Sequence, residues 1–140
     1  MSLTANEARD LARRFHELAN ALGSYRFDNW NGLKPAERQK LESDEWTLLN
    51  QSVDLVNYAI GITLDDAEAN LAELAKATGR AKNAIKKIKT VRRVIEIGTA
   101  AVVFGAAIIS RSPSAIGTAL GKLNDATSPP KKKDAKKVEE

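Results

Sequence analysis

From Leu64 to Ile109, mostly apolar residues recur at alternating intervals of three and four, and no proline interrupts them. This heptad spacing places the apolar side chains along one side of a helix, as in helices that pack lengthwise. A single helix over 64–110 would hold about 46 residues and measure about 70 Å, at 1.5 Å per residue. Gly79 is the expected position of a kink or break, because glycine in a helix interior costs about 1 kcal/mol relative to alanine. The pattern predicts an all-α chain.

The N-terminal segment carries the signals of a first helix over about 5–22. Thr4 and Glu7 have the spacing of a capping box, in which each side chain accepts a hydrogen bond from the backbone amide of the other residue. Gly23 suits the left-handed position that follows many helices. Residues 24–34 are turn-prone and have no helical period, so we expect a connecting loop there.

Two more helices are predicted. Pro35 fits the first turn of a helix over about 35–61, whose many aliphatic residues form a broad buried face, with Trp46 in the core or at its boundary. Pro113 ends the long helix, and a short helix follows over about 114–123.

These elements predict a bundle of three to four helices with one long C-terminal helix and a short helical hairpin end. At 140 residues the chain has the length of one domain, which we place at 1–124. The last residues, 125–140, are rich in lysine and lack an apolar period, so we expect a disordered tail there.

Charge is distributed very unevenly between the two halves of the chain. Residues 1–73 hold 7 Lys/Arg against 13 Asp/Glu, whereas residues 74–140 hold 15 against 5. Such an imbalance is typical of proteins that contact nucleic acid, anionic lipid or an acidic partner. It also allows the two halves to attract one another.

A block of cations without acids lies between Glu73 and Glu96. Three interpretations are open: a solvated face or a partner for the acidic N-terminal half, a surface for anionic lipid, and a surface for nucleic acid. The block contains no aromatic residue for base stacking, which argues against binding of single-stranded nucleic acid. Its members are Lys76, Arg80, Lys82, Lys86, Lys87, Lys89, Arg92 and Arg93.

The block is followed by an uncharged run from Ile97 to Ser110. At 1.5 Å per residue it covers about 21 Å, short of the roughly 30 Å of bilayer hydrocarbon. A buried core helix and a membrane-docking helix both fit this length. A second uncharged run follows the proline turn, so the two could form an apolar hairpin with cationic flanks. Arg111 at its tip opposes full insertion, because a charge at the bilayer centre costs a few kcal/mol.

The composition leaves little room for catalysis. The chain has no cysteine and a single histidine, which excludes thiol nucleophiles, disulfides and zinc ribbons. His16 stands without a recognisable nucleophile or carboxylate motif, so we expect no enzyme, metal site, cofactor or small-molecule substrate. The polar, helical start lacks the apolar core of a signal peptide, which predicts a cytoplasmic chain. The basic and apolar C-terminal half would place it peripherally at the membrane or inserted in it.

An aromatic group in the first connecting loop is a candidate partner-binding patch. Tyr25, Phe27 and Trp30 lie there at irregular spacing. Exposed aromatic side chains often anchor interfaces, and the alternative is that these three cover the open end of the bundle.

Our leading hypothesis is a non-enzymatic helical protein that associates with anionic membranes through its basic and apolar C-terminal half and self-assembles there. The order of elements looks like that of helical pore-forming proteins, although no sequence motif is shared. The alternatives are a soluble coiled-coil or helical-bundle module for protein–protein interaction, and nucleic-acid binding through the basic helix. The predicted contact residues are Lys86, Lys87, Lys89, Arg92, Arg93, Ile97, Val102, Val103, Phe104, Ile108 and Ile109.

Overall fold

The computed structural model of the chain describes residues 3–58, 71–87 and 90–128, and this part is all-α, as predicted. It contains five α-helices rather than three to four. Their bounds, with that of one 3₁₀ turn, are α1 Ala5–Asp28, η1 Trp30–Gly32, α2 Pro35–Tyr58, α3 Leu71–Lys87, α4 Val91–Ser110 and α5 Pro113–Thr127.

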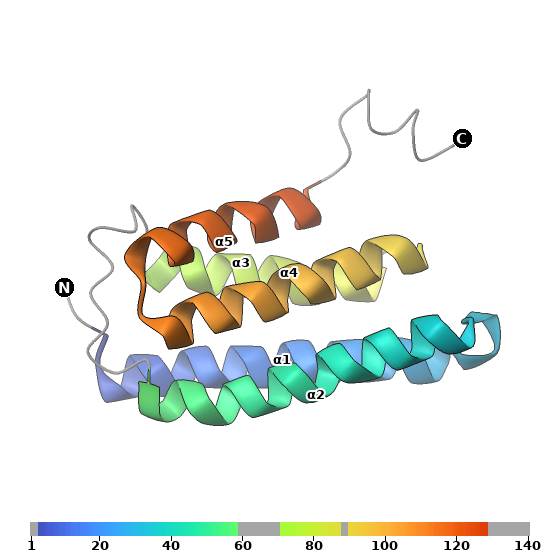
Figure 1. Cartoon of the computed structure of the whole chain (residues 1–140), viewed down its shortest axis with the longest axis horizontal. Coiled ribbons are helices and arrows are strands. Elements are labelled where there is room, and N and C mark those ends of the chain that lie inside the picture. Colours follow the sequence, from blue (N-terminus) through green and yellow to red (C-terminus); the bar gives the residue numbers. More distant parts are fainter. Residues whose placement is uncertain (1–2, 59–70, 88–89, 129–140) are drawn as a thin grey trace.

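The helices form a layered bundle in which consecutive helices run in opposite directions (Figure 1). α1 and α2 pack side by side; α3 lies on α1 and α4 on α2, and α5 covers α3 and α4. Because the directions alternate, one end of the molecule holds the C-terminal ends of α1, α3 and α5 and the N-terminal ends of α2 and α4. We call this the basic end, since Lys86 and Lys87 of α3 and Arg92 and Arg93 of α4 lie there.

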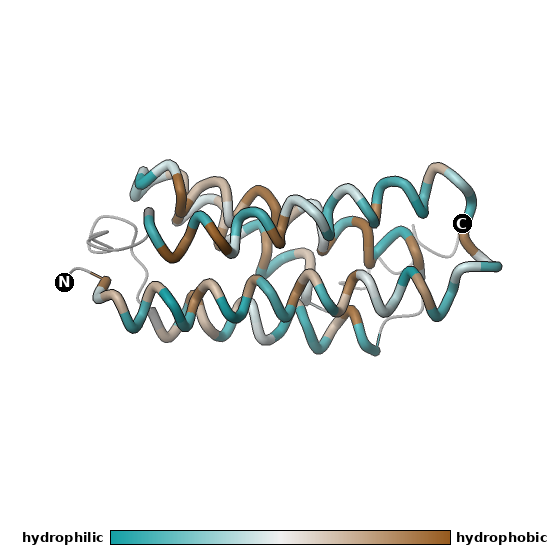
Figure 2. Tube along the Cα trace, turned by 90° about the horizontal axis from the view of Figure 1, so that it is seen from below, coloured by the Kyte–Doolittle hydropathy of each residue, from teal (hydrophilic) through white to brown (hydrophobic). Residues whose placement is uncertain are grey.

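The core is continuous from α1 to α5. It includes leucines of α1 and α2, isoleucines of α3 to α5, and two phenylalanine rings, Phe15 and Phe104, stacked with their centroids 5.9 Å apart. Burying a side chain of this size stabilises a fold by about 1.5–3 kcal/mol. Figure 2 shows apolar residues alternating with polar ones along the helices, the pattern of helices that bury one face.

The prediction of one long helix over 64–110 is wrong. α3 ends at Lys87 and α4 begins at Val91, with Thr90 in an extended conformation (φ −82°, ψ 116°). Gly79, the predicted break, lies inside α3. Because the chain reverses direction after α3, the apolar side of α4 packs on α2 and α5. A single straight helix would leave this apolar side exposed. The predicted residues 64–70 lie outside the described part.

The first helix is longer than predicted, because α1 continues through Gly23 to Asp28. The continuation buries Tyr25, which is 8% exposed, on the inner side of the helix. A Cβ at Gly23 would lie 2.6 Å from a carboxylate oxygen of Glu45, so this glycine allows α2 to approach closely. Gly23 therefore serves helix packing rather than helix termination, and the predicted loop is confined to the residues after α1.

The last helix also extends further than predicted. α5 runs to Thr127, so the first three residues of the predicted disordered tail are helical. Pro113 occupies its first turn and the Ser112 hydroxyl accepts from the amide of Ala115. The rest of the tail from residue 129, and the predicted end of the second helix beyond Tyr58, lie outside the described residues.

Candidate functional site

The basic block faces solvent rather than the acidic N-terminal half. Among its described members, Lys82 alone makes an ion pair to that half, with Nζ 3.2 Å from a carboxylate oxygen of Glu17. The other four described cations of α3 (Lys76, Arg80, Lys86 and Lys87) are exposed. Mutual attraction between the halves therefore neutralises little of this positive charge.

At the basic end, the cations come from two adjacent helices. Lys86 and Lys87 close α3, where they also suit the negative end of the helix dipole. Arg92, in the first turn of α4, is 80% exposed and pairs with Glu96 at 3.4 Å, a surface contact worth under about 1 kcal/mol. The Arg93 guanidinium donates to the carbonyl of Ser128 at 3.0 Å. Lys89 lies outside the described residues.

The predicted apolar contact residues divide between core and surface. Ile97, Phe104 and Ile108 are 0–1% exposed, so the bundle itself encloses them. Val102 and Ile109 are half-buried, and Val103 is 44% exposed.

α4 is the one helix, within the described part of the chain, that is long and apolar enough to cross a membrane. Core helices of soluble proteins pass the same criterion, and 44% of its most apolar window is buried here. The structure thus gives α4 a core side and a solvent side. The solvent side carries Thr99, Val103, Ala106 and Ser110.

The contact between α2 and α4 contains two polar layers. Asp44 and Gln51 occupy heptad positions of α2 between the buried Leu41, Leu48 and Leu55. Both polar side chains are themselves buried, at 3% and 7% exposure. Polar residues at such positions fix register between helices at a cost in stability.

Glycines of α4 make room for these two side chains. A Cβ at Gly98 would lie 3.2 Å from Oδ2 of Asp44, and a Cβ at Gly105 would overlap the carboxamide of Gln51. Gln51 Nε2 donates to the carbonyl of Val102 at 2.9 Å, and Asp44 Oδ1 accepts from Lys40 Nζ at 3.0 Å. We call these residues the polar layers of the α2–α4 contact.

One oxygen of each polar layer lacks a protein hydrogen bond. Asp44 Oδ2 and Gln51 Oε1 are buried and have no partner among the described residues. An unsatisfied buried acceptor costs about 1–3 kcal/mol. The α2–α4 contact is therefore weaker than the apolar packing on either side of it.

The predicted aromatic patch separates into one core residue and two exposed residues. Tyr25 belongs to the core, whereas Phe27 is 80% exposed and Trp30 44% exposed. The guanidinium of Arg38 lies 4.6 Å from the centroid of the Trp30 ring, and that of Arg26 lies 5.9 Å from it. Two guanidinium groups thus lie beside the Trp30 ring.

The fold brings the C-terminal end of α1 next to that of the basic helix α3, although the two are far apart in the sequence, and Tyr25 is the member of the aromatic group that lines the hollow between them. The end of α3 lies against the end of α1, where both line one hollow with Tyr25, Asp28, Asn29, Lys82 and Lys86. The sequence analysis treated the aromatic group and the basic block separately. Their proximity depends on the fold, in which α1 and α3 both run toward the basic end.

The sequence analysis did not predict that apolar side chains of α2 are exposed on its outer side. Trp46 and Val53 are 59% and 65% exposed and lie seven residues apart on α2, so they share its outer side. Val53 and Val56 line a groove with Ala12 and His16 of α1. The prediction that Trp46 is core or boundary is wrong. The sequence did contain a signal for this, because α2 has more apolar residues than one buried face can hold.

No group of three or more His, Asp or Glu side chains in the described residues could hold a metal ion, and His16 is exposed on α1. Comparison of the chain with models of known protein families, with curated proteins and with solved structures finds no match.

Proposed function

We propose that this protein is non-catalytic and binds anionic membrane surfaces as a folded bundle. The observation that carries the proposal is the group of cations where α3 ends and α4 begins: Lys86, Lys87 and Arg92 are exposed, and Arg93 beside them is half-buried. A basic residue near an anionic leaflet contributes about 1 kcal/mol of attraction. Lys86 and Lys87 contribute in full, whereas Arg92, paired with Glu96, and Arg93 contribute less, and together they supply a weak, reversible attraction without an inserted helix.

Binding at the surface leaves α4 in place. Transfer of α4 into lipid would remove Ile97, Phe104 and Ile108 from the core, at about 1.5–3 kcal/mol for each side chain before any gain from lipid. It would also carry Arg111 toward the bilayer centre. Surface binding requires neither step, so it is the form of membrane association that this fold favours.

Co-sedimentation with phosphatidylcholine vesicles, with and without phosphatidylserine, tests the proposal. We expect binding only to the anionic vesicles, weakening as salt rises because surface attraction is screened beyond about 8 Å at physiological ionic strength. The double variant Lys86→Gln, Lys87→Gln should lose about tenfold or more in affinity. The matched control, Lys76→Gln, Arg80→Gln, removes the same charge from the same helix and should lose less. Absence of binding to anionic vesicles at low salt would refute the proposal.

A second candidate is a soluble module for protein–protein interaction, favoured by the exposed side chains Trp46 and Val53 and the groove beside them. It differs from the predicted coiled coil, because the heptad positions Leu74, Ala81 and Ile85 of α3 are buried within the bundle. Sedimentation velocity of the wild type and of Trp46→Ser separates this candidate: an oligomer that dissociates in the variant supports it. Nucleic-acid binding through the basic block predicts a steep loss of RNA or DNA affinity with salt.

A further inference from the structure

We propose that the bundle docks end-on, with Phe27 and Trp30 entering the headgroup region of an anionic membrane. This inference rests on the proposed function and adds the orientation and the anchoring residues. We call Phe27 and Trp30, with the flanking Arg26 and Arg38, the aromatic tip. The α1–α2 turn that carries it projects beyond the C-terminal end of α3 and the N-terminal end of α4 (Figure 1).

Phe27 is exposed to solvent at the C-terminal end of α1. It lies in the last turn of α1 and, at 80% exposure, is the most exposed large apolar side chain of the described residues. Its neighbour in the sequence two residues earlier, Tyr25, is buried, so the helix end is well packed and Phe27 is simply the side chain on its outer side. The fold does not bury the Phe27 ring, so the ring would gain free energy by transfer from water to an apolar phase such as the membrane interior.

Trp30 is suited to the boundary between headgroups and hydrocarbon. Indole rings concentrate at that depth because they combine a large apolar surface with one N–H donor. The Nε of Arg38 donates to the backbone carbonyl of Trp30 at 3.0 Å, which fixes the guanidinium beside the ring. The two terminal nitrogens of Arg38 make no ion pair among the described residues. They are therefore available for a lipid phosphate, which the guanidinium fork binds bidentately.

Attraction to the membrane comes from beside the tip rather than from the tip itself. Arg26 is engaged by Glu45 at 2.9 Å and Glu42 at 3.5 Å, so its charge is compensated. Lys86 and Lys87, at the C-terminal end of α3, are exposed and make no ion pair among the described residues, and Lys86 lines a hollow with Asp28 and Asn29, which follow Phe27 in the chain. Aromatic anchors and surface cations thus meet on one end of the molecule, the combination that an anionic interface selects.

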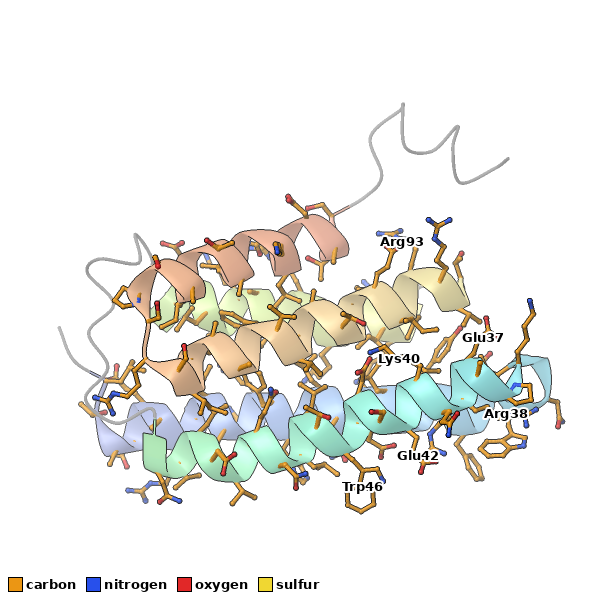
Figure 3. All side chains as sticks on the ribbon, in the orientation of Figure 1. Glu37, Arg38, Lys40, Glu42, Trp46 and Arg93 are labelled. Atoms are coloured by element: carbon orange, nitrogen blue, oxygen red, sulfur yellow. The ribbon has the colours of Figure 1, made fainter. Side chains whose placement is uncertain are left out.

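A side-on orientation on the outer face of α1 and α2 offers less free positive charge than the basic end. Residues 3–58, which contain both helices, hold 9 Asp/Glu against 7 Lys/Arg, and Arg13 in the groove of this face is paired with Asp10 and Glu17. Trp46, which lies on this face, points away from the other helices and sits further from the basic end than Arg38 (Figure 3). The position of each tryptophan relative to the membrane therefore reports the orientation.

The two tryptophans are the only ones in the chain, which gives a direct test. Trp46→Phe leaves Trp30 as the sole indole, and Trp30→Phe leaves Trp46 while keeping an aromatic ring at the tip. With anionic vesicles containing brominated lipid, we expect blue-shifted and quenched emission from Trp30 and unchanged emission from Trp46. Quenching of Trp46 with unchanged Trp30 would overturn the end-on orientation.

A second variant measures the anchor itself. Phe27→Ser should lower the affinity for anionic vesicles by about tenfold or more, because it removes the ring that enters the interface. Val53→Ser, at 65% exposure on the outer face, is the matched control and should bind as the wild type does. Equal binding of Phe27→Ser and wild type overturns the inference but leaves the proposed function standing. Failure of the unaltered chain to bind removes both.

Discussion

At the scale of single residues, neighbouring aromatic side chains of this protein have opposite environments. Tyr25 and Phe27 are two positions apart on α1, yet one is 8% and the other 80% exposed. Because a helix turns by about 100° per residue, a separation of two places side chains on nearly opposite sides. The opposite environments of Tyr25 and Phe27 follow from the sequence once α1 is known to continue through Gly23. They could not be predicted while residues 24–34 were assigned to a loop.

The environment of Tyr25 predicts a pH dependence of stability. Burial raises the pKa of the phenol above its ordinary value of 10.0, and the nearby charge of Glu37 raises it further. The folded state therefore holds the proton more tightly than the unfolded chain. This stabilisation is complete below pH 10 and is lost as pH rises through 10 and above.

We expect the free energy of unfolding to fall between about pH 9 and pH 11 more steeply in the wild type than in Tyr25→Phe. Denaturant titrations at both pH values measure the difference. The two proteins differ at residue 25 alone, so the comparison isolates Tyr25. Parallel curves would contradict the assignment.

At the scale of helices, two glycines inside helices have opposite roles. Gly79 has nothing within 4 Å of the position that a Cβ would occupy, so its lack of a side chain serves no contact in the described structure. Gly105 faces Gln51 and has Phe15 Cε2 2.8 Å from that position. The first is a conformational cost to α3, and the second is what permits α2 to lie close to α4.

Gly79→Ala should stabilise the protein by about 0.5–1 kcal/mol, because alanine reduces the freedom of the unfolded chain and fits the helix without a clash. Thermal or chemical unfolding followed by circular dichroism measures the change. A loss of stability would indicate that α3 requires the glycine for a contact with residues outside the described part.

Gly105→Ala should destabilise the protein by about 1–3 kcal/mol, because the added methyl group meets the Gln51 carboxamide and the Phe15 ring in a packed core. The same unfolding measurement applies, with Gly79→Ala as the control for the substitution itself. An unchanged stability would show that Gln51 moves aside freely and that the polar layer does not hold α2 and α4 in register.

At the scale of the whole molecule, the sequence predicted the parts better than their arrangement. The capping box of Thr4 and Glu7 is present, and the apolar positions of α1 are buried as their helical period predicts. The break at Thr90 escaped prediction because neither glycine nor proline marks it, and because a heptad pattern fits a hairpin as well as one straight helix. The basic end follows from that hairpin, so it was equally out of reach of sequence reasoning.

We expect the bundle to stay intact on the membrane, and a cross-link between its polar layers tests this. The chain has no cysteine, so Gln51→Cys with Gly105→Cys introduces a single cross-link between α2 and α4. A Cβ at Gly105 would lie 2.7 Å from Cδ of Gln51, so the side chains of the two positions meet, and Gln51→Cys removes the carboxamide that this Cβ would overlap. The oxidised form holds α4 in the bundle, and the reduced form of the same protein is its own control.

If docking uses the intact bundle, the oxidised and reduced forms bind anionic vesicles with equal affinity, and neither releases an entrapped dye. If binding instead requires α4 to leave α2, oxidation abolishes binding or dye release while reduction restores it. The cross-link thus distinguishes a protein that rests on the membrane from one that opens into it. The enclosed positions of Ile97, Phe104 and Ile108 favour the first outcome, because leaving the core exposes all three before lipid can receive them.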